Sequence, residues 1–243
     1  MIEELITEKE TVKTAIFSEE AARLKFDHVA KYYFWIMGFL EIKPNLQAIE
    51  LADIKKGECL LDIGFGTGWC LERLVPLVGQ EHVTYGLDFS EGMKEVTLEN
   101  LRKKGLDKSV SLHNANVKDM PFEDNKFDLV FISFVIDLLE KKDIPIALRE
   151  IKRVLKPSGR VIIFSMTKEG KNIFKIARYL YEWMYHKWPT ILGYKPSCRP
   201  IYIENIVMKA GFEIAKYRLT YISGFLFPIA IILARPKLKE GKK

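Results

Sequence analysis

The chain has 243 residues, of which 48% are hydrophobic and 29% charged, as in an ordinary soluble globular protein. This composition excludes a disordered chain, and no apolar stretch reaches the ~20 residues that a transmembrane helix needs. The acidic N-terminus does not have the pattern of a secretion signal. Cys59, Cys70 and Cys198 have neither zinc-site nor disulfide-framework spacing, so we expect free thiols, no metal and a cytoplasmic protein.

The net charge is +6, and lysines are concentrated in the C-terminal segment 237–243. Such a basic tail could suit an anionic membrane surface or nucleic acid, but an ordinary solvated surface with a frayed tail is the favoured interpretation. Basic and aromatic residues are not interleaved as in RNA-binding modules. Peripheral contact with a membrane or lipid therefore stays open, and no nucleic-acid partner is expected.

From Cys59 onward, short apolar runs alternate with segments of helical period, which predicts parallel βαβ units. Strands are predicted at 59–63, 83–87, 110–113, 127–134 and 160–165, and helices at 71–78, about 90–101, 144–155 and 203–210. Two further strand-like runs end near Ala234. The helix before the fifth strand is expected to stop at a turn over residues 156–159, where Pro and Gly end helices.

The predicted fold class is α/β, with helices on both faces of a Rossmann-like, doubly wound sheet. Its seven strands are mostly parallel, and the last strand is antiparallel. Residues 1–55 form a helical N-terminal extension or cap, and 56–236 form the Rossmann-like domain. An aromatic helical insertion interrupts that domain at about 171–200, and 237–243 is the basic tail.

The strongest motif is Asp62-Ile63-Gly64-Phe65-Gly66-Thr67-Gly68, between the first strand and the first helix of the sheet. Glycines let the backbone turn sharply and approach a ligand closely, and the helix that follows offers unpaired N–H groups. A dinucleotide fingerprint, G-x-G-x-x-G, would require glycine at Trp69, and no phosphate-loop G-K-[ST] follows. The spacing therefore argues against a nicotinamide enzyme.

A second motif ends the next strand, where Asp88 is placed to accept hydrogen bonds from two ribose hydroxyls. Phe89 follows it and suits either an adenine face or the core.

Several stretches resemble the class I S-adenosylmethionine-dependent methyltransferases, and most of all the group similar to ubiquinone/menaquinone-biosynthesis C-methyltransferases (methyltransferase type 11). The resemblance covers roughly 60–164 and adds a segment of the extension. The stretches that carry it are 26–32 (FDHVAKY), 62–68 (DIGFGTG), 88–93 (DFSEGM), 116–122 (NVKDMPF), 127–128 (FD), 132–134 (ISF) and 153–159 (RVLKPSG).

This resemblance implies S-adenosyl-L-methionine as the cofactor and S-adenosyl-L-homocysteine as the product. Asp62, Gly64, Gly66, Thr67 and Gly68 would line the methionine end, Asp88 would hold the ribose, Asn116 and Val117 would meet the adenine, and Ser133 would lie near the reacting methyl. Phe65, Phe89 and Met93 complete the predicted donor site.

The acceptor site is expected over the carboxyl ends of the strands. Two aromatic segments are candidates to roof it: 26–39, with Tyr32 and Tyr33, and 174–188, which leads to Arg199. Their side chains favour a small apolar or aromatic acceptor, such as a quinol, a lipid or another ring, although packing explains them equally. His28, Asp137 and His186 are candidate bases, and no catalytic residue is assigned.

Two other functions stay open at this point. One is an RNA or protein methyltransferase, and the other is a non-catalytic scaffold that binds S-adenosylmethionine.

Overall fold

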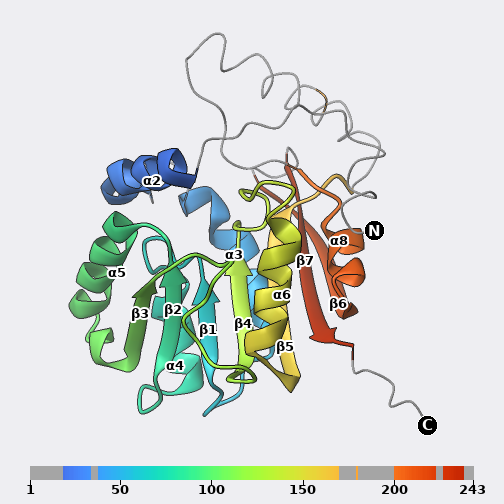
Figure 1. Ribbon diagram of the computed structural model, residues 1–243. Helices are drawn as coiled ribbons and strands as arrows, with labels where there is room; N and C mark the ends of the chain where they lie inside the picture. The colour runs from blue at the N-terminus through green and yellow to red at the C-terminus, as the bar shows by residue number, and fades with distance from the viewer. Residues whose placement is uncertain (1–18, 34–37, 170–178, 180–199, 223–226, 238–243) are drawn as a thin grey trace.

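The protein, seen in a computed structural model, is described over residues 19–33, 38–169, 179, 200–222 and 227–237. Its sheet has seven strands in the order β3-β2-β1-β4-β5-β7-β6 (Figure 1). The strands are β1 (Leu60–Ile63), β2 (Thr84–Asp88), β3 (Val110–Asn114), β4 (Phe127–Ser133), β5 (Leu155–Met166), β6 (Phe212–Ile222) and β7 (Phe227–Pro236). Of these strands, β7 alone runs antiparallel to its neighbours β5 and β6, which confirms the predicted topology.

The strand order reverses between β1 and β4. From β1 the chain first builds outward through β2 and β3, and it then returns to place β4 on the other side of β1. In open α/β sheets such a reversal leaves a crevice at the carboxyl ends of the strands, where ligands bind.

Helices cover both faces of the sheet, as predicted. They are α2 (Glu19–Tyr33), α3 (Phe39–Ala52), α4 (Leu71–Val78), α5 (Glu91–Lys103), α6 (Ile144–Val154) and α8 (Ile203–Lys209), with a 3-10 turn η2 (Asp107–Ser109). None of the helices in the described ranges is long and apolar enough to cross a membrane.

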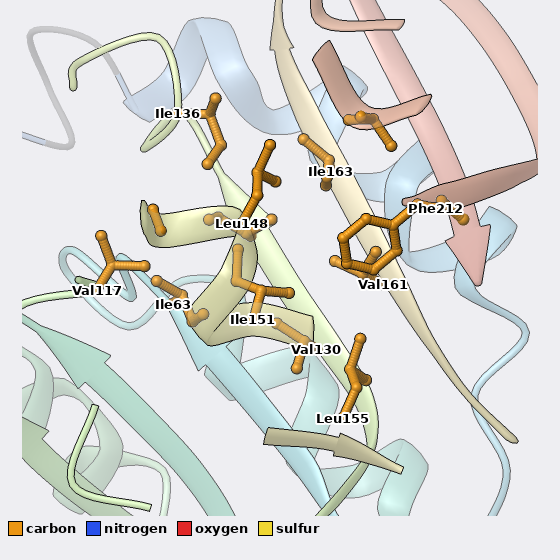
Figure 2. Packing of buried hydrophobic residues seen from close by; sticks show 14 of the residues in the cluster. Ile63, Val117, Val130, Ile136, Leu148, Ile151, Leu155, Val161, Ile163 and Phe212 are labelled. Atoms are coloured by element: carbon orange, nitrogen blue, oxygen red, sulfur yellow. The ribbon is translucent and has the colours of Figure 1, made fainter. Parts of the chain in front are cut away.

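Side-chain alternation along the strands produces the two cores. Val130 and Ile132 of β4 face α6 and α8, whereas Leu129 and Phe131, which alternate with them, face α3 and α4. Figure 2 shows Leu148 of α6 among the strand residues on the first face. Helices α3 and α4 therefore cover one face of the sheet, and α6 and α8 cover the other.

The predicted turn at 156–159 is wrong in its boundaries. Helix α6 ends at Val154, and β5 begins at the next residue instead of at Arg160. Leu155 pairs with Phe127 and Arg160 pairs with Leu129, so the intervening residues form an irregularity within the strand. Pro157 is exposed in this irregularity. A bulge accommodates proline because the residue there makes no hydrogen bond to the neighbouring strand, so the missing N–H breaks none.

The N-terminal extension places two helices at the carboxyl edge of the sheet. Helix α2 lies over the strand tips beside α5, and α3 begins next to it and runs down behind the sheet (Figure 1). The extension is thus helical in its described part, as predicted. The aromatic segment 174–188 lies outside the described residues except for Tyr179, which is exposed.

Candidate functional site

The loop between β1 and α4 has three glycines in the left-handed region, with φ of +74° at Gly64, +53° at Gly66 and +81° at Gly68. A Cβ on Gly64 would lie 2.3 Å from Cγ2 of Val135, and one on Gly68 would lie 2.7 Å from Cγ2 of Thr97. At Gly66 the nearest such atom is 4.0 Å away, so this residue borders open space. Backbone conformation requires all three glycines, and close packing requires two of them.

Two side chains of helix α5 hold this loop by donating hydrogen bonds to the carbonyls of the loop. Thr97 Oγ1 donates to the carbonyl of Gly66 at 2.7 Å, and Asn100 Nδ2 donates to that of Thr67 at 3.0 Å. Phe65 and Met93 are buried together in the small core between α2, α4 and α5. The Phe65 and Met93 side chains therefore anchor the loop and the helix, and contact with the donor stays a prediction for them.

Asp88 lies at the tip of β2 and is almost fully buried. Its Oδ2 accepts a hydrogen bond from Gly66 N, and its Oδ1 accepts one from Ser90 N, both at 3.0 Å. Burial raises the pKa of Asp88 to about 6, although these backbone donors act to lower it. A carboxylate has about four acceptor positions, so Asp88 keeps acceptor capacity for the ribose hydroxyls that the sequence predicts.

Asp62 is the clearest sign of a ligand. It is fully buried in β1, and neither of its carboxyl oxygens has a hydrogen-bond partner among the described residues. Burial, and secondly the charge of Asp88, raise the pKa of Asp62 to about 8. Because a buried carboxylate without a partner is costly, the site calls for a positively charged group. S-adenosylmethionine carries an ammonium and a sulfonium, so these residues fit it.

The predicted adenine side lies after β3. Asn116 Oδ1 accepts from the N–H of Lys118 at 3.0 Å, and Val117 is buried in the main core. Asn114, which the sequence analysis missed, pairs with Asp88 across the sheet and donates from Nδ2 to its carbonyl at 3.2 Å. A polar residue at a strand end beside Asp88 was the signal for it. Phe89 is half-buried and meets the Phe26 ring edge-on at 5.9 Å.

At the tip of β4, Ser133 Oγ donates to Oδ1 of Asn45, a long contact of 3.5 Å from helix α3. The same oxygen accepts from Sγ of Cys70 at 3.2 Å. Phe134 follows with φ +51°, an unusual conformation for a bulky residue, and its ring packs edge-on against Phe164 at 4.5 Å. Backbone strain of this kind is concentrated at functional sites.

The cap helices bring Tyr33 and Glu41 together. Tyr33 Oη donates to Oε1 of Glu41 at 3.3 Å. Burial raises the pKa of Glu41 to about 8, although the hydrogen bond from Tyr33 acts to lower it. The charge of Asp137 adds to the increase. Asp137 is itself buried and accepts from the N–H of Met166 at 3.1 Å.

The structure does not place the other predicted acceptor-site residues beside Tyr33 and Glu41. Tyr32 is 65% exposed, and His28 is also exposed on α2. His186 and Arg199 lie outside the described residues. Substrate contact by Tyr32 or Arg199 stays a prediction.

Asp27 fixes α2 to α5. Its Oδ1 accepts from Ser90 Oγ at 2.5 Å and from Gly92 N at 3.0 Å. Ser90 Oγ in turn accepts from Met93 N at 3.1 Å, so Ser90 is the N-cap of α5. A Cβ on Gly92 would lie 2.9 Å from the carbonyl oxygen of Asp27, so this glycine permits the close approach of the two helices.

Comparisons with known proteins agree with this geometry. The family description "Methyltransferase domain" matches residues 60–159. The 2-phytyl-1,4-naphtoquinone methyltransferase of Trichormus variabilis is 31% identical over 157 residues, 63% of this chain and 68% of that protein. The ubiquinone/menaquinone biosynthesis C-methyltransferase UbiE of Teredinibacter turnerae is 31% identical over 176 residues, 71% of this chain and 70% of that protein.

Two solved structures share the fold. A SAM-dependent methyltransferase from Aquifex aeolicus has a TM-score of 0.61 at 22% identity and covers 90% of this chain and 100% of its own. The 1,6-didemethyltoxoflavin-N1-methyltransferase of Burkholderia thailandensis, which contains S-adenosylhomocysteine, has a TM-score of 0.67 at 14% identity and covers 93% and 94%. The chain therefore belongs to the class I S-adenosylmethionine-dependent methyltransferases, in the group similar to the ubiquinone/menaquinone-biosynthesis C-methyltransferases.

Proposed function

We propose that this methyltransferase acts on a small apolar or aromatic acceptor of the quinol type. The observation that carries the proposal is that two relatives, each matched over more than two thirds of its length, are named as quinone-pathway methyltransferases. A flat acceptor also suits the Burkholderia protein, whose structure contains 1,6-didemethyltoxoflavin.

The proposed donor site combines the glycine loop with the two strand-end carboxylates. Asp88 would accept from the ribose hydroxyls, and Asp62 would pair with the ammonium group of the methionine end. Gly64, Gly66, Thr67 and Gly68 would leave room for that end. Phe89, Asn116 and Val117 would border the adenine, and Ser133 would border the reacting centre.

S-adenosylmethionine supplies an activated methyl group on a sulfonium, so the protein mainly has to hold the two reactants in line. The acceptor would enter over the tips of β1 and β4, beneath α2 and α3. Of the cap helices, α2 contributes Tyr33, which donates a hydrogen bond to Glu41 of α3. Packing alone also explains the position of Tyr33, and an acceptor assay separates these two roles.

The proposal is tested with donor labelled in its methyl group and 2-phytyl-1,4-naphthoquinol, made by reducing the quinone, as the acceptor. In parallel, the lipid, small polar, RNA and protein fractions of a cell extract are offered. We expect label in the quinol and in the lipid fraction. Label confined to the RNA or protein fraction would replace the proposed acceptor, and no transfer at all would leave the quinol proposal wrong.

The donor site is tested separately by calorimetric titration with S-adenosylhomocysteine. Asp88→Ala removes a charged acceptor of two hydrogen bonds, so its affinity should fall by about tenfold or more. Glu123→Ala, which removes an exposed carboxylate, is the control and should bind like the wild type. Equal affinities for Asp88→Ala and the wild type would mean that the ribose contact is misplaced.

A further inference from the structure

Asn45 of α3 is a buried polar residue that has no role in the proposed donor site. Only 5% of it is exposed, and the helix around it is mostly apolar. Its Oδ1 accepts hydrogen bonds from Cys70 Sγ at 3.2 Å and from Ser133 Oγ at 3.5 Å. Burial raises the pKa of the Cys70 thiol well above its usual value, so the thiol keeps its proton and donates it. The oxygen of the Asn45 amide is therefore held by the protein.

The nitrogen of the same amide group is not held in this way. Within the described part of the chain, Nδ2 of Asn45 donates no hydrogen bond. It is also not one of the fully buried polar atoms that lack a partner there, so it borders open space. An amide nitrogen carries two N–H donors, and donors in an almost fully buried side chain normally have a partner. That partner has to enter the space beside Nδ2.

This space lies where the strand order of the sheet reverses. Cys70 precedes α4 directly after the glycine loop, and Ser133 is the last residue of β4, which pairs with β1. The carbonyl oxygen of Ser133 would lie 3.6 Å from a Cβ on Gly64, so the tip of β4 is next to the first glycine of the loop. Figure 1 shows the start of α3 at this edge. Asn45 therefore borders the crevice in which open α/β sheets bind ligands.

We propose that Asn45 is a substrate-binding residue of the acceptor site, where Nδ2 donates a hydrogen bond to an oxygen of the methyl acceptor. The inference rests on the proposed function, because a quinol carries hydroxyl oxygens on the ring that receives the methyl group. The residues proposed for the donor come from the sheet and its loops, whereas Asn45 comes from the cap. The acceptor oxygen is therefore its partner, and the hydrogen bond fixes the orientation of the ring.

The contacts of Oδ1 prepare the amide for this role. Hydrogen bonds from Cys70 and Ser133 hold the amide before the acceptor binds, so little side-chain entropy is lost when Nδ2 finds its partner. An N–H donor binds an ionised oxygen more strongly than a neutral one, so a quinol that has lost a hydroxyl proton gains most. Loss of the amide should weaken use of the acceptor and leave donor binding intact.

The test measures methyl transfer from labelled S-adenosylmethionine to 2-phytyl-1,4-naphthoquinol in the wild type and in Asn45→Leu, which has nearly the same side-chain volume. In the variant, kcat/KM for the quinol should fall by about tenfold or more, mainly through a higher KM. The affinity for S-adenosylhomocysteine, measured by calorimetry, should change by less than about twofold. Thermal unfolding checks that the variant is folded, and Asn45→Ala, which adds no apolar volume, replaces it if it is not.

Two further variants separate substrate binding from a structural role. Gln47→Leu makes the same change on the same helix, at a half-buried residue whose Oε1 has no partner among the described residues, and should alter neither value. Cys70→Ala removes the hydrogen bond between Cys70 and Asn45 but leaves Nδ2 in place. It should lower kcat/KM for the quinol by less than about threefold.

The outcomes distinguish this inference from the proposed function. If Asn45→Leu weakens S-adenosylhomocysteine as much as it impairs the quinol reaction, the amide contacts the donor and the inference is overturned. If Asn45→Leu has no effect, or Cys70→Ala impairs the reaction equally, Asn45 only ties α3 to the sheet. In both cases the quinol remains the acceptor. If the wild type binds S-adenosylhomocysteine but does not methylate the quinol, the proposed acceptor is wrong and the role of Asn45 falls with it.

Discussion

The glycine loop and the two cap helices, α2 and α3, meet at the same edge of the sheet but are held there in different ways. The loop is fixed by partners close in the sequence, such as Asp88, 22 residues after Gly66, and Thr97, 31 residues after it. The cap is fixed by distant partners, and Asn45 and Ser133 are separated by 88 residues. Arg160 reaches back 108 residues to the carbonyl of Ala52, at the end of α3.

This difference divides the site into two kinds of chemistry. The loop supplies backbone shape and the ribose carboxylate, which a nucleoside needs whatever else is bound. The cap supplies Tyr33 and Glu41, which depend on how α2 and α3 dock. Changes to the anchors of the cap should therefore affect stability first, while changes to the loop should also affect donor binding.

The largest effect on stability is expected from Arg160→Ala, which breaks the anchor of the cap. Arg160 is buried, pairs with Glu58 at 2.7 and 2.8 Å and donates to the last carbonyls of α3. Its removal leaves Glu58 and those carbonyls without their partner, so the free energy of unfolding should fall by about 3–5 kcal/mol. Urea unfolding measures this change.

Arg235→Ala is the control for that anchor. Arg235 is exposed and donates to a single carbonyl, that of Ser158, at 3.2 Å. Its loss should change the free energy of unfolding by less than about 1 kcal/mol. If the two variants are destabilised equally, the buried ion pair does not anchor α3.

The difference between the loop, fixed by nearby residues, and the cap helices, fixed by distant ones, also explains which features the sequence predicted. The strands, the helices on both faces and the positions of Gly64 and Asp88 depend on local periodicity and on spacing within one βαβ unit, and these predictions are confirmed for the fold. No local pattern identifies Glu41 or Asn45, because the partners of a polar residue in an apolar helix are set only when the helix packs on the sheet. The start of β5 was missed because a proline and a glycine predict a break, and β4 pairing overrides it.

Apolar residues near the glycine loop are ambiguous for a related reason. Phe65, Met93 and Val117 were predicted beside the donor, and their side chains lie in the cores. An apolar side chain suits either place, and the sequence does not say which of its faces is covered. Contact between these side chains and the donor stays a prediction.

The next largest effect is expected from Gly64→Ala, which breaks the loop. The added Cβ overlaps Val135 at 2.3 Å, and φ at this position is +74°. The backbone conformation costs roughly 1–2 kcal/mol and the overlap roughly 1–3 kcal/mol, so stability and S-adenosylhomocysteine binding should both fall. Thermal unfolding and calorimetry report the two losses.

Gly105→Ala isolates the conformational part of that loss. Gly105 has φ of +69°, and an added Cβ meets nothing within 4 Å, so only the roughly 1–2 kcal/mol of backbone strain should appear. Donor affinity should be unchanged there. A Gly64→Ala variant that is no less stable than Gly105→Ala, or that binds S-adenosylhomocysteine normally, would contradict the close packing of the loop.

The smallest effect is expected where the two regions touch, at Asp27. Asp27→Asn keeps an oxygen for Ser90 Oγ and Gly92 N but removes a negative charge from the N-terminus of α5, which should cost about 0.3–1 kcal/mol of stability. The charge of Asp27 also contributes to raising the pKa of Asp88, so its removal should lower that pKa. Ribose binding favours the ionised carboxylate, so S-adenosylhomocysteine affinity in the wild type should rise with pH near 6, and in Asp27→Asn the rise should occur at lower pH. Calorimetry between pH 5 and 7 measures this displacement, and a rise at the same pH in both proteins would mean that the cap does not act on the ribose carboxylate.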